Sequence, residues 1–468
     1  MTTAAPQPVQ SLLDEHRERN GDQSAIEAVR ARVAEAGVEF VYYQVVTVTG
    51  RIVGKVAPAT ELMRNVENGL RAHPGVLADL QTDGAGIMLA GHPERCECVV
   101  MPDLDSFAVL PWDRRTGFFF CRMYEPPGAP DGTGGRPMPL DARGAFARSH
   151  AAFTARTGLE LRSGCEPEAT WTVPGMSCEH VPGAPHPMYH VGQMEQLRPV
   201  YQKVMSYGQE LGLAMIESNC EGPGQLELNW MYDRADRTAD RLVLHRLICR
   251  QVARELGAKV TFMPKPAEDR LGNGCHHNIS LWEGDRNVLL DPEASGLHLS
   301  LTGRHALGGI LAHSAAAAAV MAPTVNSYKR FVATGQFAPQ AINWGMDNKT
   351  CAVRLPAAGR LEVKAPDAMA NPYLSHAAIL ASVEDGLKNS IDPGPPRGGT
   401  DAAVADRFGT LPLALDEALD LLAADQVLVQ GIGPELTDLF LRLKRQEWAR
   451  FCGAVTDWER AMYDAEGC

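Results

Sequence analysis

One stretch near the middle of the chain, residues 259–281, constrains the fold more than any other. It begins with an apolar run, breaks at Pro264 and passes Gly272 and Gly274 before an alternating pattern resumes and carries His276. Apolar runs and alternation predict strands, whereas proline and glycine predict the turn between them. The stretch therefore predicts two strands, a tight turn and a histidine on one strand face, which is the arrangement of a site rather than of a linker.

The length and net charge of the chain limit the kinds of molecule that it is expected to bind. A chain of 468 residues can bury a large core and is long enough for two domains. The formal net charge is -13 and no block of Lys and Arg is present, so neither nucleic acid nor an anionic membrane is expected as a partner. The most apolar segment, residues 306–322, is too short for a bilayer span and predicts a buried helix. Small molecules are the expected partners.

The eleven cysteines are scattered along the chain. No secretory leader pattern precedes them, so they are expected to be reduced thiols in a cytoplasmic protein. Cys96 and Cys98 form the one closely spaced pair, and no second Cys/His pair follows at zinc spacing. The spacing therefore does not predict a structural zinc site.

The order of patterns predicts an α+β protein with three parts. Residues 1–24 are expected to be a flexible N-terminus, because the chain begins with a segment rich in Thr, Ala and Pro. Residues 25–115 are expected to form a small domain of helices and strands, and residues 116–468 a larger unit in which helical and alternating stretches interleave. A Pro- and Gly-rich loop follows the expected boundary.

Two local predictions concern the N-terminal part. Helical periodicity spans residues 12–38 with one interruption, and Asp22 and Ser24 are candidate N-caps, so one or two helices are expected. Residues 40–56 are rich in β-branched and aromatic side chains on both sides of Gly50, which predicts a hairpin with a tight turn.

Acidic residues recur in short motifs around this framework. Glu166 and Glu168 stand two residues apart in an extended segment, so both carboxylates face the same way. Glu227 opens a second alternating segment, and Glu362 lies between two basic residues in a third. Any one glutamate is best explained as a surface or ion-paired residue. Several carboxylates with one imidazole, however, form a hard ligand set that suits Mg²⁺ or Mn²⁺ better than zinc.

The motifs, taken in order, resemble those of the glutamine synthetase family, in character its type I members. The matching segments are Gly164-Cys-Glu166-Pro-Glu168, Gly224-Gln225-Leu-Glu227, Gly272-Asn-Gly274-Cys-His276, Asn326-Ser-Tyr-Lys-Arg330, and Pro366-Asp367 followed by Asn371-Pro-Tyr-Leu374. The resemblance extends from about residue 40 to residue 463. It implies a β-grasp-like N-terminal domain, a catalytic domain with a curved antiparallel sheet flanked by helices, and a homo-oligomer of stacked rings, expected to be a dodecamer, with sites between subunits.

The resemblance also assigns roles to residues. The implied cofactors are ATP and two or three Mg²⁺ or Mn²⁺ ions per site. The implied metal ligands are Glu166, Glu168, Glu227, His276 and Glu362, with Glu221, in a segment one residue shorter than usual, as a sixth candidate. The implied contacts to the acid substrate are Gly272, Arg330 and Lys364. The implied nucleotide contacts are Asn278, Ser280, Arg354 and Arg360. The implied catalytic residues are Arg354, Lys349 and, as the base, Asp79, with Asp83 as the alternative; either aspartate could instead cap a turn.

Departures from the family pattern concern the substrates. Glutamine-forming members have a glutamate just before Ala-Pro, where this chain has Phe337. An apolar ring there suits an organic amine better than ammonium, and members that make γ-glutamylamides look similar at this position. Alternatively, Phe337 only packs the flap. Lys349 and Lys364 replace arginines and Asn278 replaces a histidine, which changes how carboxylate and phosphate are held.

The expected function is ATP-dependent ligation of glutamate, or a close analogue, to an organic amine through an acyl phosphate. Three alternatives stay open: an ordinary glutamine synthetase that uses ammonium, a non-catalytic family member, and a metal-dependent hydrolase. The first two are distinguished by turnover with ammonium and by failure to consume ATP with any acid and amine.

Overall fold

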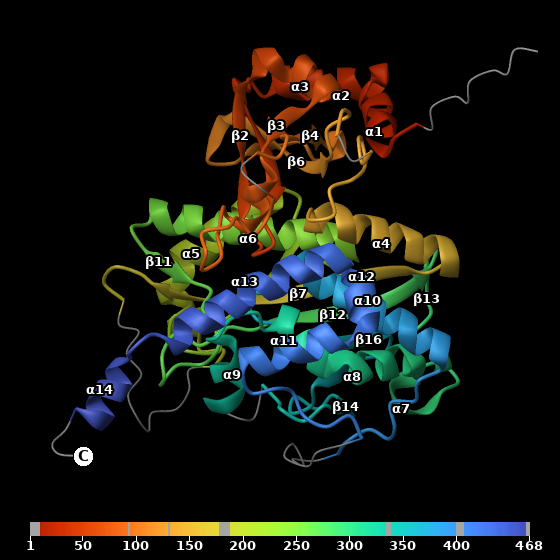
Figure 1. Cartoon of the computed structure of the whole chain (residues 1–468). Coiled ribbons are helices and arrows are strands. Elements are labelled where there is room, and N and C mark those ends of the chain that lie inside the picture. The colour runs from red at the N-terminus through yellow and green to blue at the C-terminus, as the bar shows by residue number, and fades with distance from the viewer. Residues whose placement is uncertain are drawn as a thin grey trace, which may run out of the picture.

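The structure is a computed structural model that describes residues 10–91, 94–129, 132–176, 188–333, 338–398 and 407–464. A small sheet with its helices sits above a much larger sheet that is surrounded by helices (Figure 1). Helices and sheets therefore form separate layers in an α+β fold, as the sequence predicts. Across the described ranges, no helix is both long and apolar enough to cross a membrane.

The small sheet is built from the first third of the chain. Its strands run in the order β2-β1-β6-β4-β3, with β5 beside β6, and only the pairing of β1 with β6 is parallel. The elements are α1 Leu12–Asn20, α2 Gln23–Glu35, β1 Phe40–Val46, β2 Ile52–Pro58, α3 Leu62–Asn68, β3 Leu70–Ala72, β4 Cys98–Pro102, β5 Ala108–Leu110 and β6 Asp113–Tyr124. The predicted hairpin is confirmed as β1 and β2, and Gly50 at its turn has a positive φ of 79°.

Two features differ from the expected division of the chain. Within the expected flexible segment 1–24, α1 is an ordered helix, because Leu13 is buried and His16 hydrogen-bonds Tyr124 Oη at 2.9 Å. Asp22 caps α2 by accepting from the Ala25 amide. Strand β6 crosses the expected boundary at residue 115 and pairs with β1 and β4, so the small sheet extends beyond that boundary.

The large sheet has the strand order β14-β15-β16-β12-β7-β9-β8 and carries the central stretch of the sequence. Its pairings are antiparallel except for β14 with β15. The strands are β7 Glu160–Thr172, β8 Met215–Asn219, β9 Gln225–Trp230, β10 Asp233–Arg234, β11 Lys259–Thr261, β12 Cys275–Glu283, β13 Arg286–Asn287, β14 Trp344–Met346, β15 Val353–Ala357 and β16 Arg360–Val363.

Most helices of this part surround the large sheet and form much of the core, whereas the last, α14, buries no residue. They are α4 Ala142–Thr157, α5 Val191–Glu210, α6 Ala235–Glu255, α7 Ser295–His298, α8 Leu301–Met321, α9 Ser327–Ala333, α10 Pro372–Asn389, α11 Leu415–Ala424, α12 Gln426–Ile432, α13 Pro434–Cys452 and α14 Asp457–Tyr463. The predicted buried helix is confirmed as α8. A Cβ at Gly309 would lie 2.0 Å from the Ser382 carbonyl oxygen, so glycine is required where α8 and α10 cross.

A histidine connects three of these helices. His313 on α8 hydrogen-bonds through Nδ1 to Asp425, the N-cap of α12, at 2.6 Å, and through Nε2 to Asp385 on α10 at 3.2 Å. Burial lowers the pKa of His313, but the two carboxylates outweigh burial and raise it overall. The imidazolium therefore stabilises the packing of α8, α10 and α12.

We expect His313→Gln to lower the free energy of unfolding by about 1–2 kcal/mol near pH 6. Because the folded-state pKa is raised, this contribution is complete below the unfolded pKa of about 6.5 and is lost as pH rises through the folded pKa. The difference between variant and wild type should thus shrink by pH 9. Urea unfolding across this range measures it, with the exposed His190→Gln as control; a difference that is constant with pH would contradict the assignment.

Candidate active site

Strand register gathers the acidic motifs on one face of the large sheet. On β7, Glu166 lies opposite His276 of β12, and Glu168 lies opposite Glu227 of β9. Glu362 on β16 pairs with β12 two residues beyond His276. Since residues two apart on a strand share a face, these five side chains project from the same side of four neighbouring strands. Residues far apart in sequence are thereby brought into one cluster.

The cluster lines a cavity of about 240 Å³. The cavity contains both the acidic residues and a group of cationic side chains. Nine of the residues singled out in the sequence line it: Glu166, Glu168, Glu221, Glu227, His276, Lys349, Arg354, Glu362 and Lys364. A site that holds anions and a divalent cation together needs charges of both signs, and the cavity supplies them.

His276 stands at the centre of the acidic group. Its Nδ1 lies 3.2 Å from Oε1 of Glu362 and 3.4 Å from Oε2 of Glu166, and Nη1 of Arg354 donates to Oε2 of Glu362 at 3.0 Å. Burial opposes ionisation of both groups, yet the contacts of His276 with Glu166 and Glu362 raise the pKa of His276 to about 9, and the imidazole lowers the pKa of Glu362 to about 2. Each group therefore favours the charged form of the other.

The pKa of Glu227 is shifted in the opposite direction to that of Glu362. Its Oε1 accepts from Nδ2 of Asn219 at 2.9 Å and from Nδ2 of Asn229 at 2.8 Å. Burial, together with repulsion from Glu166 and Glu168, nevertheless raises the pKa of Glu227 to about 8. The like-charged neighbours disfavour the ionised form of Glu227, and a cation bound between the carboxylates would offset this repulsion.

Glu168 is held by groups of the central loop. Its Oε2 accepts from the amide of Gly274 at 2.7 Å and from Nε2 of Gln225 at 3.0 Å. Burial raises the pKa of Glu168 in spite of the nearby imidazole of His276. The Gly-x-Gly turn thus fixes the orientation of a carboxylate, which explains why the turn and the acidic motif occur together.

The donor set fits Mg²⁺ or Mn²⁺. Ligand atoms of Glu166, His276 and Glu362 all lie within 4.8 Å of one another. Among the described residues, the buried Oδ1 atoms of Asn219 and Asn229 have no hydrogen-bond partner. Carboxylate and amide oxygens with one imidazole are hard ligands, and unsatisfied oxygens beside crowded carboxylates call for a bound cation or its water.

The cationic side of the cavity consists of Lys349, Arg354 and Lys364. Nζ of Lys364 donates to the carbonyl oxygen of Lys349 at 2.5 Å. Burial, and to a lesser degree the nearby guanidinium groups, lowers the pKa of Lys364 to about 8, although Glu362 opposes the change. A lysine that is desolvated in this way gains most from an anionic ligand.

Arg330 lies outside the cavity lining, and its contact with the acid substrate stays a prediction. It is buried, and its guanidinium donates to the carbonyl oxygens of Ala365 at 3.2 Å and Lys364 at 3.1 Å, with His276 Nε2 at 3.2 Å. Gly272 packs against it, and a Cβ there would lie 2.8 Å from Cγ of Arg330. Both residues thus position the walls of the cavity.

Of the residues predicted to contact the nucleotide, one lines the cavity and three do not. Arg354 lines the cavity, whereas Asn278 is on the same strand face as His276 but outside the lining, and it donates through Nδ2 to Glu166 Oε1 at 2.8 Å. Ser280 continues the same strand face and accepts from Nε1 of Trp282 at 2.8 Å. Arg360 is exposed, two residues before Glu362 on β16.

Two further predicted residues remain, one of them in the N-terminal part of the chain and the other outside the described residues. Asp79 belongs to the small sheet's loops, where it has a positive φ of 52° and accepts from Oγ1 of Thr49 at 2.7 Å. It does not line the cavity of its own chain. Phe337 lies outside the described residues, so its assignment stays a prediction.

Sequence reasoning missed part of the lining, namely Met188, Tyr189, Glu217, Asn219 and Asn229. Strand alternation could have identified Asn229, which stands two residues after Glu227 on β9. Tyr189 follows from no pattern, since it comes from a loop and has a positive φ of 58°. It is also exposed, at the edge of the cavity.

Comparison with known proteins identifies the family of this chain. The family model described as glutamine synthetase, catalytic domain, matches residues 151–463. A glutamine synthetase of Rhizobium meliloti (strain 1021) is 33% identical over 409 residues, which cover 82% of this chain and 90% of the relative. A glutamate--methylamine ligase of Methyloversatilis universalis is 34% identical over 378 residues, covering 77% and 83%.

Solved structures agree as well. The GmaS/ADP complex has a TM-score of 0.82 and 32% sequence identity, and the match covers 93% of this chain and 98% of that one. GmaS without ligand matches equally well. The family match spans well over half of the chain and includes every strand that lines the cavity. This chain belongs to the glutamine synthetase family of ATP-dependent ligases.

Proposed function

We propose that this ligase joins the γ-carboxylate of glutamate, or of a close analogue, to an organic amine at the expense of ATP. The observation that carries the proposal is the single cavity in which carboxylates of β7, β9 and β16 face Lys349, Arg354 and Lys364. The acidic half suits divalent cations and an amine, and the cationic half suits phosphate and a substrate carboxylate.

The proposed reaction proceeds in two steps through an acyl phosphate. A carboxylate oxygen of the acid attacks the γ-phosphorus of ATP in line, ADP leaves, and the amine nitrogen then displaces phosphate from the acyl phosphate and loses a proton. Divalent ions at the acidic cluster would neutralise phosphate charge. Lys349, Arg354 and Lys364 add positive charge, while His276, Glu166 and Glu362 keep their positions through their mutual contacts.

The choice of an organic amine rests on two observations. A glutamate--methylamine ligase and the GmaS structures are among the similar proteins. In addition, the flap segment Gly335-Gln-Phe337-Ala-Pro339 has no carboxylate to bind ammonium. The rival activity, glutamine formation from ammonium, is favoured by the several relatives named glutamine synthetase.

The catalytic base and the assembly belong to the same proposal. Asp79 lies away from the cavity of its own chain, in the N-terminal part. Stacked rings of subunits, with the N-terminal part of one chain beside the cavity of the next, would let Asp79 serve a neighbouring site. Two or three Mg²⁺ or Mn²⁺ ions per site complete the proposal.

The test is phosphate release from ATP with Mg²⁺ and glutamate, scanned over ammonium and a panel of alkyl-, aryl- and polyamines. Products are identified by mass spectrometry. We expect one organic amine to exceed ammonium in kcat/KM and to yield a γ-glutamylamide. Faster turnover with ammonium would establish glutamine synthesis instead, and no ATP consumption with any acid and amine would indicate a non-catalytic member.

A further inference from the structure

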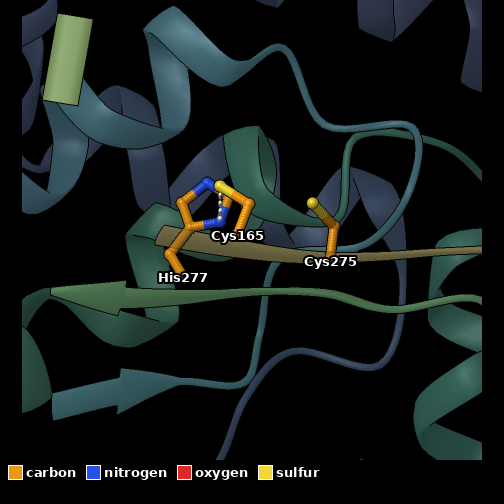
Figure 2. Close-up of side chains that lie close together, drawn as sticks. All are labelled: Cys165, Cys275 and His277. Atoms are coloured by element: carbon orange, nitrogen blue, oxygen red, sulfur yellow. Dashed lines mark hydrogen bonds between the residues drawn. The ribbon is translucent and has the colours of Figure 1, made fainter. Parts of the chain in front are cut away.

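The face of β7 and β12 opposite the cavity carries a second cluster of possible metal ligands. Cys165, Cys275 and His277 alternate along the strands with Glu166 and His276, so they point to the other side of the sheet. Figure 2 shows the three side chains on the same side of the two strands. All three are fully or almost fully buried, and their ligand atoms lie within 4.8 Å of one another.

Two contacts hold the ring of His277. Its Nε2 lies 2.8 Å from Oγ of Ser375, which also donates to the carbonyl oxygen of Pro372 at 3.2 Å. Its Nδ1 lies 3.5 Å from Sγ of Cys165. The ring of His376 stacks on His277 at 4.4 Å and 15°. The imidazole is therefore held with its ligand atom toward the thiols, as outer contacts hold metal-bound histidines.

The geometry fits a metal ion better than a disulfide. In a tetrahedral site with a metal–sulfur bond of about 2.3 Å and a metal–nitrogen bond of about 2.0 Å, sulfur and nitrogen lie about 3.5 Å apart. The separation of Cys165 Sγ and His277 Nδ1 equals this value. The cysteines are diagonal neighbours, because Cys165 pairs with His277 and Cys275 with Pro167. Diagonal Cα atoms lie roughly 7–8 Å apart, beyond the usual range for a disulfide.

A buried cation lies beside the two cysteines. The buried guanidinium of Arg246 interacts electrostatically with Cys165 and Cys275 and donates to the carbonyl oxygen of Ala370 at 2.7 Å. Two thiolates beside one arginine can accept a soft cation without leaving a large net charge in the core. Sulfur and imidazole ligands select thiophilic ions such as Zn²⁺ or Cu⁺ over the hard ions that suit the cavity.

We propose that Cys165, Cys275 and His277 bind one soft, thiophilic metal ion on the hidden face of the sheet. Binding releases the two thiol protons as the metal–sulfur bonds form. The ion cross-links β7 and β12, the strands that present Glu166 and His276 to the cavity. It is a positioning element behind the active site, and it takes no part in ligation.

Metal analysis of the full-length protein tests the proposal. Cells are grown with added zinc or with added copper, and the purified protein is washed with EDTA to strip the open cavity. Inductively coupled plasma mass spectrometry should then find about one ion per chain. The growth condition, zinc or copper, in which the washed protein retains metal distinguishes Zn²⁺ from Cu⁺. Chelator-washed protein without zinc or copper from either growth condition would overturn the proposal.

Variants locate the ion. The double variant Cys165→Ser/Cys275→Ser should retain at least about tenfold less metal. The matched control Cys96→Ser/Cys452→Ser, which changes two exposed cysteines, should retain all of it. Because the buried variant could fail to fold, X-ray absorption spectroscopy of the wild type provides a second measurement. It should show two sulfur neighbours at about 2.3 Å and a nitrogen at about 2.0 Å; oxygen neighbours alone, or equal metal in both double variants, would refute the site.

Discussion

Glu362→Gln is expected to reduce ATP-dependent ligation by about 10³-fold, which corresponds to roughly 4 kcal/mol of transition-state stabilisation. Glutamine keeps the size of the side chain and an oxygen that can accept from Arg354, but it removes the charge that faces His276 at 3.2 Å. A divalent cation bound at the cluster would lose an anionic ligand. The reduction should appear in kcat measured by phosphate release at saturating Mg²⁺.

The control for this variant is Glu283→Gln, which removes an exposed carboxylate near the end of β12. It should leave turnover unchanged. Circular dichroism and thermal melting of both variants separate loss of chemistry from loss of fold. Undiminished turnover in Glu362→Gln would show that the acidic cluster does not hold the catalytic cation.

Phe337→Glu should shift the preference between organic amine and ammonium by about 100-fold toward ammonium, because it replaces an apolar side chain by a carboxylate. The reason is the resemblance to the family pattern, which implies a carboxylate in glutamine-forming members where this chain has Phe337. A carboxylate binds ammonium and accepts its proton. The substitution also removes the apolar ring that an alkyl or aryl group would contact. Competition assays with both nitrogen donors measure the ratio directly.

Phe337→Leu is the matched control, because it stays apolar and should keep the preference for the organic amine. Gln336→Glu places the same charge one residue earlier and should have a smaller effect. An amine-to-ammonium ratio that is the same in Phe337→Glu and wild type would mean that the flap does not select the nitrogen donor.

Local chemistry let the sequence predict much of the fold and the acidic side of the site. The hairpin around Gly50, the cap at Asp22 and the buried helix α8 each follow from side-chain pattern and turn preference over short distances. The shared face of Glu166 and Glu168 follows from the period of a strand. These features depend on neighbours in sequence, so no knowledge of the fold is needed.

The sequence by itself, through the order of its motifs, also determined the family and with it the kind of reaction. Three features were decided only by the tertiary structure. Arg330 donates to backbone carbonyl oxygens, and His313 joins three helices. Asp79 lies outside the cavity lining of its own chain. The same holds for Cys165 and His277, whose spacing gives no metal signal. Each of these contacts joins segments distant in sequence, and strand register and helix packing, rather than local pattern, set which atoms meet.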